Sequence, residues 1–426
     1  MRQTAGVHLG GGAGRSDSDV YDVAIVGAGL IGLATAYQLQ KRCPELRLVV
    51  VDKEPRIASH QSGHNSGVLH AGVYYAPGSL KARLCVTGKA AIERFAEEKA
   101  IPFERCGKLI VATDAGELPR LAALRERAVR NGVAGVTEVD ADGITAIEPH
   151  VVGVRAVHVP GTAIIDFTRV AEALAEDVAE TGGTMVLGAE VEDLGEDAGS
   201  GVTLVTSNGD LRAGRVIVCA GLHSDRLGRR NGQRMQIVPF RGDYYTLKAD
   251  ARSLVRGLVY PVPDPTLPFL GVHFTRRIDG AVWAGPNAVL ALAREGYGRT
   301  TVDIADLVGT LRFPGFWRLS RRYWRVGAIE AWRDLVKPAF VQALRRYVPD
   351  LASSDLVFGP SGVRAQAVGI DGAMIDDFAI DETEKVIYVR NAPSPGATAS
   401  LAIGDHLAQL AIDRFSLGAR RDTAEG

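Results

Sequence analysis

Three of the nine histidines of this chain, His60, His64 and His70, fall within eleven consecutive positions. They lie in residues 60–75, a segment interspersed with glycine, serine and asparagine that is typical of a loop. A neutral imidazole titrates near neutral pH, so it can take a proton from a substrate. Glycines disfavour a helix that would align the histidines on zinc, and the segment has no cysteine or carboxylate to complete a ligand set. We therefore expect a loop that touches a cofactor or its substrate and holds no metal.

A glycine-rich turn precedes this loop and has the pattern of a dinucleotide-binding site. The apolar residues 22–26 predict a buried strand, Gly27, Gly29 and Gly32 follow it, and a helical pattern continues from there. A second buried strand at 46–51 ends in Asp52. In this βαβ arrangement phosphates lie at the helix N-terminus, and the carboxylate accepts hydrogen bonds from ribose hydroxyls.

The glycine pattern alone does not distinguish NAD from FAD. Two further segments favour FAD: a strand and small-residue turn at 216–221, and a late loop at 391–398 that leads into a helix at 397–412. A longer cofactor has a second end to hold, and a helix N-terminus near the flavin favours negative charge on the reduced ring. The residues expected to bind the cofactor are Gly27, Gly29, Gly32, Asp52, His60, His64, Asn65, Ser66, Val191, Ala220, Gly221, Ser394, Gly396 and Thr398.

The composition limits the class of protein. The chain has 426 residues, enough for two or three domains, with 46% hydrophobic residues and a formal net charge of −1. This near-neutral charge argues against nucleic acid as a partner. Four scattered cysteines indicate reduced thiols in a cytoplasmic protein, and no apolar run is long enough to span a membrane. Residues 1–19 read as a disordered leader.

The positioning elements suggest an α/β fold of two domains. A doubly wound, Rossmann-like parallel sheet would bind the cofactor, and an α+β domain with an antiparallel sheet would cover the substrate. Helices are predicted at 79–100 and at about 166–180, and strands at 108–112, 184–191, 202–206, 211–219, 243–247 and 282–284. The cofactor domain is expected to comprise residues 20–90, 150–232 and 350–420, and the substrate domain residues 91–149 and 233–349.

The chain resembles the L-2-hydroxyglutarate oxidases and dehydrogenases, within the flavoprotein superfamily that includes D-amino-acid oxidase. The matching segments are 60–75, 77–82, 106–112, 239–245, 268–274, 285–290, 362–366 and 391–395. They run in order from about residue 21 to residue 410, nearly the whole expected ordered chain. One departure is Asp52, where the family more often has Glu, although either carboxylate can bind ribose.

The resemblance implies non-covalent FAD and oxidation of L-2-hydroxyglutarate to 2-oxoglutarate. A histidine would remove the hydroxyl proton while a hydride passes from C2 to flavin N5. Among the four histidines in matching segments we favour His70, with His273 second; a hydrogen-bonded structural histidine is the competing interpretation. Oxidation of another 2-hydroxy acid, or of an amino acid or amine, remains an alternative, as does flavin binding without turnover.

A substrate with two carboxylates calls for cations, preferably arginine with its planar fork. Arg364 matches the superfamily residue that grips the substrate carboxylate. Arg241 is a candidate for the second carboxylate, with an ion pair to Asp243 as its structural alternative. Tyr244, Tyr74 and Asn287 are further candidates for substrate contact, and Tyr245 and Lys81 are weaker ones.

The electron acceptor, oxygen or a membrane quinone, has no local motif. Residues 312–325 mix arginine with aromatic side chains, a composition that suits an anionic membrane surface as well as an ordinary helix of the substrate domain. We therefore expect a cytoplasmic protein with a possible peripheral contact at the inner face of the membrane.

Overall fold

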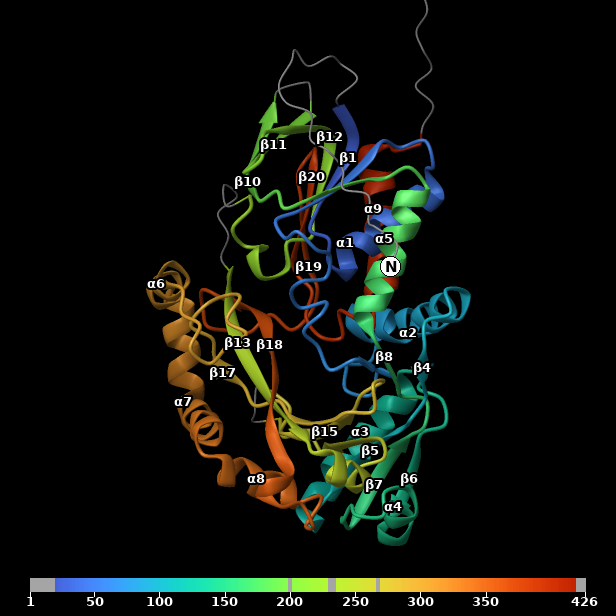
Figure 1. Ribbon diagram of the computed structural model, residues 1–426, viewed down its shortest axis with the longest axis vertical. Helices are drawn as coiled ribbons and strands as arrows, with labels where there is room; N and C mark the ends of the chain where they lie inside the picture. The colour runs from blue at the N-terminus through green and yellow to red at the C-terminus, as the bar shows by residue number, and fades with distance from the viewer. Residues whose placement is uncertain (1–19, 198–200, 229–234, 266–268, 419–426) are drawn as a thin grey trace, which may run out of the picture.

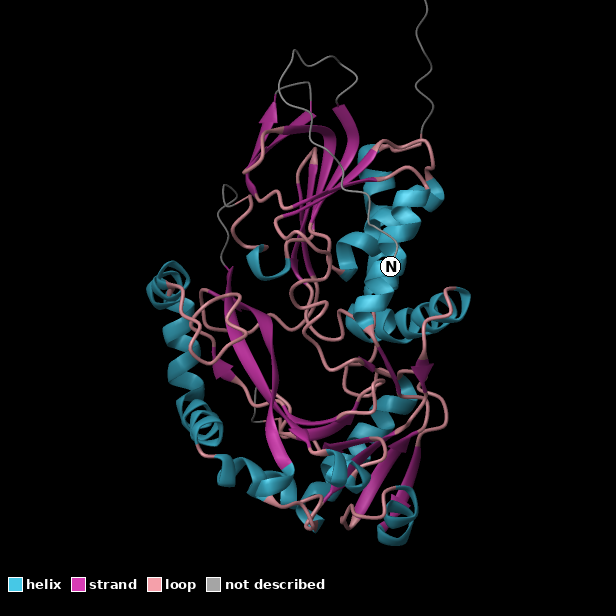
Figure 2. Cartoon of the chain, in the orientation of Figure 1, coloured by secondary structure: helices cyan, strands magenta, loops and turns pink. Residues whose placement is uncertain are grey.

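The structure is a computed structural model, and it describes residues 20–197, 201–228, 235–265 and 269–418. The predicted leader at 1–19 lies outside these residues. The described chain forms two layered units, each built on a large sheet (Figure 1). The long helices of the upper unit gather on one side of its sheet, and a second group of helices flanks the lower sheet (Figure 2).

The first sheet has a parallel centre, with strands in the order β9, β2, β1, β12 and β20. β10 and β11 form a hairpin antiparallel to the first half of β12, and β19 is antiparallel to β20. The bounds are β1 Val20–Val26, β2 Leu48–Asp52, β9 Thr184–Leu187, β10 Val191–Asp197, β11 Gly201–Thr206, β12 Leu211–Val218, β19 Ala379–Glu382 and β20 Val386–Asn391.

The central strands are continuous apolar runs because both of their faces are buried. On one face, alternate residues such as Val23 and Ile25 pack with α1, α5 and α9; on the other, Ala24 and Val26 pack with residues of β10 and β11. The parallel, Rossmann-like sheet is the one that the sequence predicted, but helices cover one of its faces and the β10–β11 hairpin covers the other, in place of the helices on both faces of a doubly wound sheet. Asp166 caps α5, as expected, by accepting a hydrogen bond from the Thr168 amide.

The second sheet has nine strands and is mostly antiparallel. Its order is β17, β13, β16, β15, β14, β5, β7 and β6, with β18 on the free side of β13. The bounds are β5 Lys108–Ala112, β6 Thr137–Asp140, β7 Arg155–Val159, β13 Met235–Leu247, β14 Leu258–Pro261, β15 His273–Arg276, β16 Val282–Gly285, β17 Val289–Leu290 and β18 Leu356–Gly369. A third, small sheet contains β3 Val68–Leu69, β4 Phe103–Glu104 and β8 Ala163–Ile165.

Nine α-helices lie within the described residues. They are α1 Leu30–Arg42, α2 Leu80–Glu98, α3 Leu118–Arg130, α4 Ala141–Ile147, α5 Phe167–Glu180, α6 Ile304–Arg312, α7 Pro314–Leu335, α8 Lys337–Arg345 and α9 Ser400–Phe415. Figure 1 shows α6, α7 and α8 along one outer edge of the lower unit. None of the helices in the described part of the chain is both long and apolar enough to cross a membrane.

The domain limits predicted from the sequence differ from the sheet membership at three places. α2 is one helix whose second half packs in the core of the first unit, so a limit at residue 90 would cut through it. β7 and β18 pair in the second sheet, although residues 150–232 and 350–420 were assigned to the cofactor domain. Strand partners far apart in sequence, such as β13 and β18, leave no local signal of this pairing.

Candidate active site

A cavity of about 380 Å³ lies at the carboxyl ends of β1, β2 and β12. Its lining includes Gly27, Gly29 and Gly32, together with Asp52, His60, Val191, Ala220 and Gly221 from the residues predicted to bind the cofactor. In parallel sheets this edge is where ligands bind. The lining on the loop 60–75 ends at Ser62, so the cavity covers the glycine turn and the start of that loop.

The start of α1 is built for close approach of an anion. Gly27 has φ +111°, and a Cβ at Gly32 would come within 1.9 Å of the Gly27 carbonyl oxygen, so both positions need glycine. The Leu30 amide donates to Ser62 Oγ at 2.9 Å, and α1 has no acidic side chain in its first turn. The helix N-terminus therefore keeps its positive end for a phosphate.

Asp52 ends β2 beside this turn. Its two carboxylate oxygens accept hydrogen bonds from the backbone amides of Ala28 at 2.6 Å and Glu54 at 2.8 Å. These bonds fix the orientation of the carboxylate and leave lone pairs for a ribose hydroxyl. The Asp52 side chain is thus positioned where the sequence predicted.

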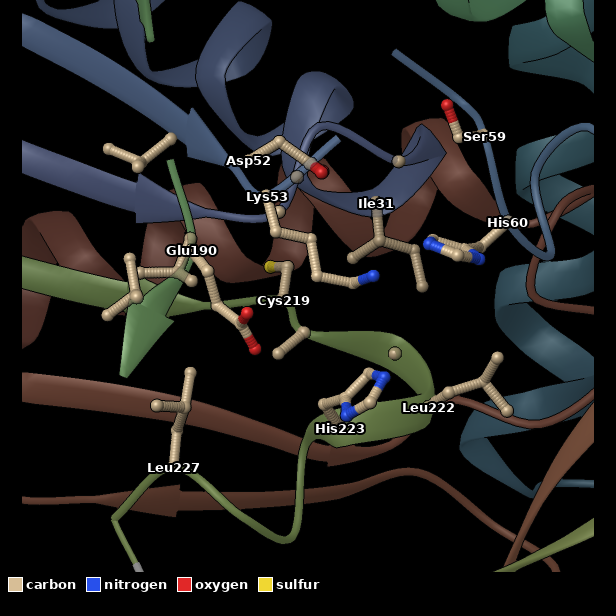
Figure 3. Close-up of a pocket in the computed structure, with 18 of the residues that line it drawn as sticks. Ile31, Asp52, Lys53, Ser59, His60, Glu190, Cys219, Leu222, His223 and Leu227 are labelled. Atoms are coloured by element: carbon tan, nitrogen blue, oxygen red, sulfur yellow. The ribbon is translucent and has the colours of Figure 1, made fainter. Parts of the chain in front are cut away.

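An ionic cluster lies at the other end of the cavity, and Figure 3 shows Lys53, His60 and His223 extending into it. Glu295 accepts hydrogen bonds from Lys53 at 2.7 Å and His223 at 2.8 Å, and the His223 bond is the first cause that lowers the pKa of Glu295 to about 2. Glu54, His60 and Glu295 have ligand types that could hold a metal ion. The Lys53 ammonium already lies 2.6 Å from Glu54 and 2.7 Å from Glu295, so a lysine occupies the position between the two carboxylates.

The loop 60–75 runs from this cavity to the second sheet and is fixed along its length. The Asn65 side chain bonds three backbone groups of the loop itself. Thr398 Oγ1, from the loop before α9, donates to the Val68 carbonyl and accepts from the His70 amide, both at 3.1 Å. Thr398, predicted to bind cofactor, therefore holds the backbone on either side of Leu69. His64 stacks on Tyr297, with ring centroids 4.1 Å apart.

Beyond the loop, one face of the second sheet carries a group of mostly buried polar side chains, here called the polar cluster. Its members are His70, Tyr74, Lys108, Tyr244, Tyr260, His273 and Arg364. In strand pairs, residues opposite one another project to the same face. Leu258 of β14 is paired with Lys108 of β5 and Val259 of β14 with Phe274 of β15, so Tyr260 shares a face with both Lys108 and His273. The Tyr260 and His273 rings stack at 3.9 Å.

Both histidines of the polar cluster are neutral. Burial lowers the pKa of His70 well below its usual range, and the neighbouring Lys108 and His273 charges add to the effect. Burial also lowers the pKa of His273 to about 3. His273 Nδ1 lies 2.8 Å from the Gly271 carbonyl, so it donates there and leaves Nε2 as the acceptor. His70 Nδ1 is buried without a hydrogen-bond partner in the described structure.

Arg364 reaches the same face from β18. Its strand position is opposite Phe240, and its guanidinium lies 4.9 Å from the Phe269 ring centroid. Burial lowers its pKa, and Tyr244, the more distant carboxylate of Glu330 and Tyr260 partly offset this. Among the described residues no carboxylate lies in ion-pair contact with it. A partly buried cation in this state is suited to an anionic ligand.

Arg241 and Asn287 lie in a different network. Arg241 is opposite Val363, so strand alternation sends its side chain to the face away from Arg364. There its guanidinium donates to Asp243 at 2.8 Å and to Asp334 at 3.4 Å. The Asn287 amide bonds the Asp243 amide and Asp334. The structure thus does not bring these two predicted substrate residues together with His70, and the ion pair with Asp243 is the one considered from the sequence.

Comparisons with known proteins agree with this arrangement. Residues 22–410 match the family model described as FAD dependent oxidoreductase. The mitochondrial L-2-hydroxyglutarate dehydrogenase of Nematostella vectensis is 47% identical to this chain, covering 94% of it and 92% of the relative. The L-2-hydroxyglutarate dehydrogenase of Indibacter alkaliphilus is 45% identical, over 93% of this chain and 100% of that protein. This chain belongs to the L-2-hydroxyglutarate dehydrogenase family of FAD-dependent oxidoreductases.

Solved structures show the same fold. L-alpha-glycerophosphate oxidase from Mycoplasma pneumoniae with FAD bound has a TM-score of 0.74 at 22% identity, over 93% of this chain and 95% of that one. Glycine oxidase from Geobacillus kaustophilus has a TM-score of 0.67 at 21% identity, over 94% and 99% of the two chains. The predicted two-domain flavoprotein architecture is confirmed.

The residues present fit FAD. The glycine turn, the start of α1 with no acidic side chain in its first turn and the fixed Asp52 carboxylate meet at one cavity, whose lining also includes Val191, Ala220 and Gly221. This cavity would hold the nucleotide part of FAD. Two further residues predicted to bind the cofactor, Ser394 and Gly396, do not line the cavity. The Ser394 side chain is hydrogen-bonded to that of Tyr75, and Gly396 allows its loop to pass close to the Ala392 carbonyl. Ser66 makes no hydrogen bond that assigns it a role.

Sequence reasoning missed two members of the polar cluster, Lys108 and Tyr260. Lys108 lies in one of the segments that resemble the family, at the start of an otherwise apolar strand that was predicted with its observed bounds. A charged residue that begins a buried strand is a recognisable signal. Tyr260 lies in the short apolar run of β14, which gives no sign of a polar role.

Proposed function

We propose that this protein oxidises L-2-hydroxyglutarate to 2-oxoglutarate. The observation that carries the proposal is the polar cluster, in which neutral histidines and cations without carboxylate partners gather where the loop 60–75 arrives from the nucleotide cavity. Neutral histidines suit removal of a hydroxyl proton, and cations suit a substrate with two carboxylates. The proteins at 41–47% identity that carry the name L-2-hydroxyglutarate dehydrogenase support this substrate.

His70 is the proposed base. Its buried Nδ1 has no partner among the described residues, and its lowered pKa keeps the ring neutral, which is the form that a proton acceptor needs before the substrate binds. Thr398 and Cys85 hold the backbone of His70 through its amide and carbonyl groups. Bound FAD supplies the acceptor, N5, for the hydride that leaves C2. His273 is the second candidate, because its Nε2 is also an acceptor.

Arg364 is proposed to hold the C1 carboxylate, next to the reacting carbon. Its planar fork can make two parallel hydrogen bonds with a carboxylate, which fixes both distance and orientation. Tyr244 lies beside Arg364 on the same face and is a further candidate for contact with this carboxylate. Tyr74, whose buried hydroxyl has no partner in the described structure, is another.

A substrate panel with a dye as electron acceptor tests the proposal. L-2-hydroxyglutarate should reduce the dye and yield 2-oxoglutarate without ammonia, whereas D-2-hydroxyglutarate and L-glutamate should be poor substrates. Release of ammonia from an amino acid at a higher kcat/KM would replace the proposal by amine oxidation. Bound FAD with no turnover of any compound would indicate a flavin-binding protein without this activity.

We also propose that α7 rests on an anionic membrane and that the acceptor is a membrane quinone. Trp324, Trp332 and Leu335 recur at helical spacing in the part of α7 that follows its kink at Tyr323, and Trp317 lies before the kink. Each of the four has more than half of its surface exposed. Arg318, Arg321, Arg322 and Arg325 are exposed among them. An exposed helical face of tryptophan and arginine matches the interface of an anionic bilayer, in which indole rings and cationic side chains are both favoured.

A further inference from the structure

Lys108 is a buried cation without the carboxylate partner that the other buried cations have. Only 3% of its surface is exposed. Four other lysines and arginines in the described part of the chain are buried to a similar degree, and each contacts a carboxylate: Lys81 with Asp376, Arg241 with Asp243, Arg294 with Asp225, and Arg390 with Asp381. Among the described residues the side-chain ammonium of Lys108 makes no hydrogen bond or ion pair, and this distinguishes Lys108 from the other four.

The groups that surround Lys108 do not balance its charge. Its ammonium lies 4.1 Å from the centroid of the Tyr260 ring and 5.3 Å from that of the Tyr74 ring, so two aromatic faces offer cation–π contact. The neighbouring His70 and His273 are neutral, and the charge of Lys108 lowers the pKa of each further. Aromatic faces contribute less than burial of an ammonium costs, and this position is therefore incomplete without an anion.

Lys108 and Arg364 lie on the same face of the second sheet, in the polar cluster. The charge of Lys108 acts on both His70 and His273, and that of Arg364 acts on His273. Strand pairing places Lys108 on β5 and Arg364 on β18, with Tyr260 and His273 on strands between them. Among the described residues neither cation is in ion-pair contact with a carboxylate, so together they suit a ligand that carries two negative groups.

We propose that Lys108 binds the C5 carboxylate of the substrate and thereby selects dicarboxylates over monocarboxylates. The inference rests on the proposed function, in which Arg364 takes the C1 carboxylate. A lysine ammonium on a flexible stem suits this distal group, which needs charge recognition but not the fixed orientation that the reacting end requires. Lys81, the alternative considered from the sequence, is already paired with Asp376.

The test compares Lys108→Met with the wild-type protein, both with FAD bound. Glutarate and pentanoate serve as probes because they share a five-carbon chain and differ by one carboxylate, and binding is followed through the absorbance of the oxidised flavin. Lys108→Met should raise the Kd of glutarate by about 30- to 100-fold, because a charged hydrogen bond is lost, and change the Kd of pentanoate by less than about threefold. Methionine has similar length and removes an unpaired buried charge, so the fold and FAD content should be kept.

Two matched variants sharpen the comparison. Lys108→Arg keeps the charge and should keep most of the preference for glutarate. Lys81→Met removes another buried lysine but should leave the ratio of the two Kd values at the wild-type value. A Lys108→Met protein with an unchanged ratio, or with both Kd values raised equally, would overturn the proposal. If the wild-type protein binds glutarate through Lys108 but does not oxidise L-2-hydroxyglutarate, the proposed function fails, and only the selection of dicarboxylates by Lys108 stands.

The wild-type protein alone gives a second test, through pH. Burial lowers the pKa of Lys108 to about 7, so above that pH the lysine must take up a proton to bind a carboxylate. The Kd of glutarate should therefore rise about tenfold from pH 8 to pH 9, and that of pentanoate should stay constant. A Kd of glutarate that is flat over this range would contradict the assignment.

The other titratable groups that face Lys108 do not change their protonation state between pH 8 and pH 9. Burial lowers the pKa values of His70 and His273, which stay neutral. Burial raises the pKa of Cys85 to about 12 and that of Cys106 to about 11, and it raises those of Tyr74 and Tyr260 above their usual range. The guanidinium of Arg364 remains charged. The predicted change in Kd thus reports on Lys108.

Discussion

At the scale of single residues, the chemistry depends on side chains that burial keeps in one protonation state. A buried imidazole has its pKa lowered because the charged form loses hydration, and this keeps His70 neutral across the neutral range, as the proposed base requires. The same burial leaves its Nδ1 without a partner, which is costly unless a ligand supplies one. An unpartnered polar atom of this kind is expected where a bound substrate supplies the missing hydrogen bond.

Replacing His70 by glutamine tests this role. We expect His70→Gln to retain FAD and to slow flavin reduction by about 100-fold or more, because the amide cannot accept the hydroxyl proton. Rapid mixing with L-2-hydroxyglutarate under anaerobic conditions measures the rate. His150→Gln is a suitable control, since His150 is exposed and pairs with Asp350. A rate within a few fold of the wild type would transfer the base role to His273.

Arg364 is tested by a change that keeps its charge. Arg364→Lys should raise the half-saturating concentration of L-2-hydroxyglutarate by about tenfold or more, because an ammonium cannot replace the planar fork. FAD content should be unchanged. Steady-state kinetics with a dye acceptor give the value, and an unaltered half-saturating concentration would remove Arg364 from the substrate site.

Motif resemblance predicted His70, His273 and Arg364 as site residues, and the structure places all three in the polar cluster; the pairing of other residues could not be predicted. Arg241 and Asn287 lie in segments that match the family, yet their side chains are used within the network of Asp243 and Asp334. Which face of β13 a side chain takes depends on its register with β18, more than a hundred residues later. Lys108 was missed because the pattern of a strand does not show whether a lysine at its first position is buried or exposed to solvent.

At the scale of elements, the loop before α9 fixes the loop that carries His70. Thr398 bonds the His70 amide and the Val68 carbonyl across more than three hundred residues of sequence. Two hydrogen bonds from one hydroxyl fix the position of the His70 backbone, because both bonds form only in one geometry.

Thr398→Val removes this hydroxyl without changing the shape of the side chain. We expect flavin reduction to slow by about tenfold, because the two backbone groups lose their partner, with FAD retained. Thr398→Ser should restore the rate, which separates hydrogen bonding from packing. The measurement is the anaerobic reduction rate; a Val variant that matches the wild type would show that Thr398 does not position His70.

α7 is the element expected to contact the membrane. Replacing Trp317, Trp324 and Trp332 by serine should lower binding to vesicles that contain anionic lipid by about tenfold or more, because the interfacial side chains are removed. Co-sedimentation measures the bound fraction, with Val129→Ser on α3 as an exposed apolar control. Equal binding by the triple variant, or equal binding to neutral vesicles, would exclude α7 as an anionic membrane surface.

The elements themselves were largely predictable where the signal is local. β5 and the Asp166 cap of α5 were predicted with their observed bounds, because alternation, apolar runs and capping residues act over a few positions. β18, a strand of 14 residues, is not among the strands predicted from the sequence. Its length follows from pairing with the 13-residue β13, and that partner is invisible in the local pattern.

At the scale of the whole molecule, the site is shared by two sheets that the chain visits in turn. The first sheet and α1 supply the nucleotide cavity, and the second sheet supplies the polar cluster, with the loop 60–75 between them (Figure 1). The sequence predicted this discontinuous plan, but its limits were displaced at α2, β7 and β18 because sheet membership is decided by distant partners.

The central claim is that this shared site passes electrons from L-2-hydroxyglutarate to FAD. The most direct measurement mixes the FAD-bound protein with L-2-hydroxyglutarate in the absence of oxygen and follows the flavin absorbance near 450 nm, the usual band of an oxidised flavin. We expect complete bleaching with formation of one equivalent of 2-oxoglutarate, and little bleaching with D-2-hydroxyglutarate. A flavin that stays oxidised with L-2-hydroxyglutarate would contradict the central claim.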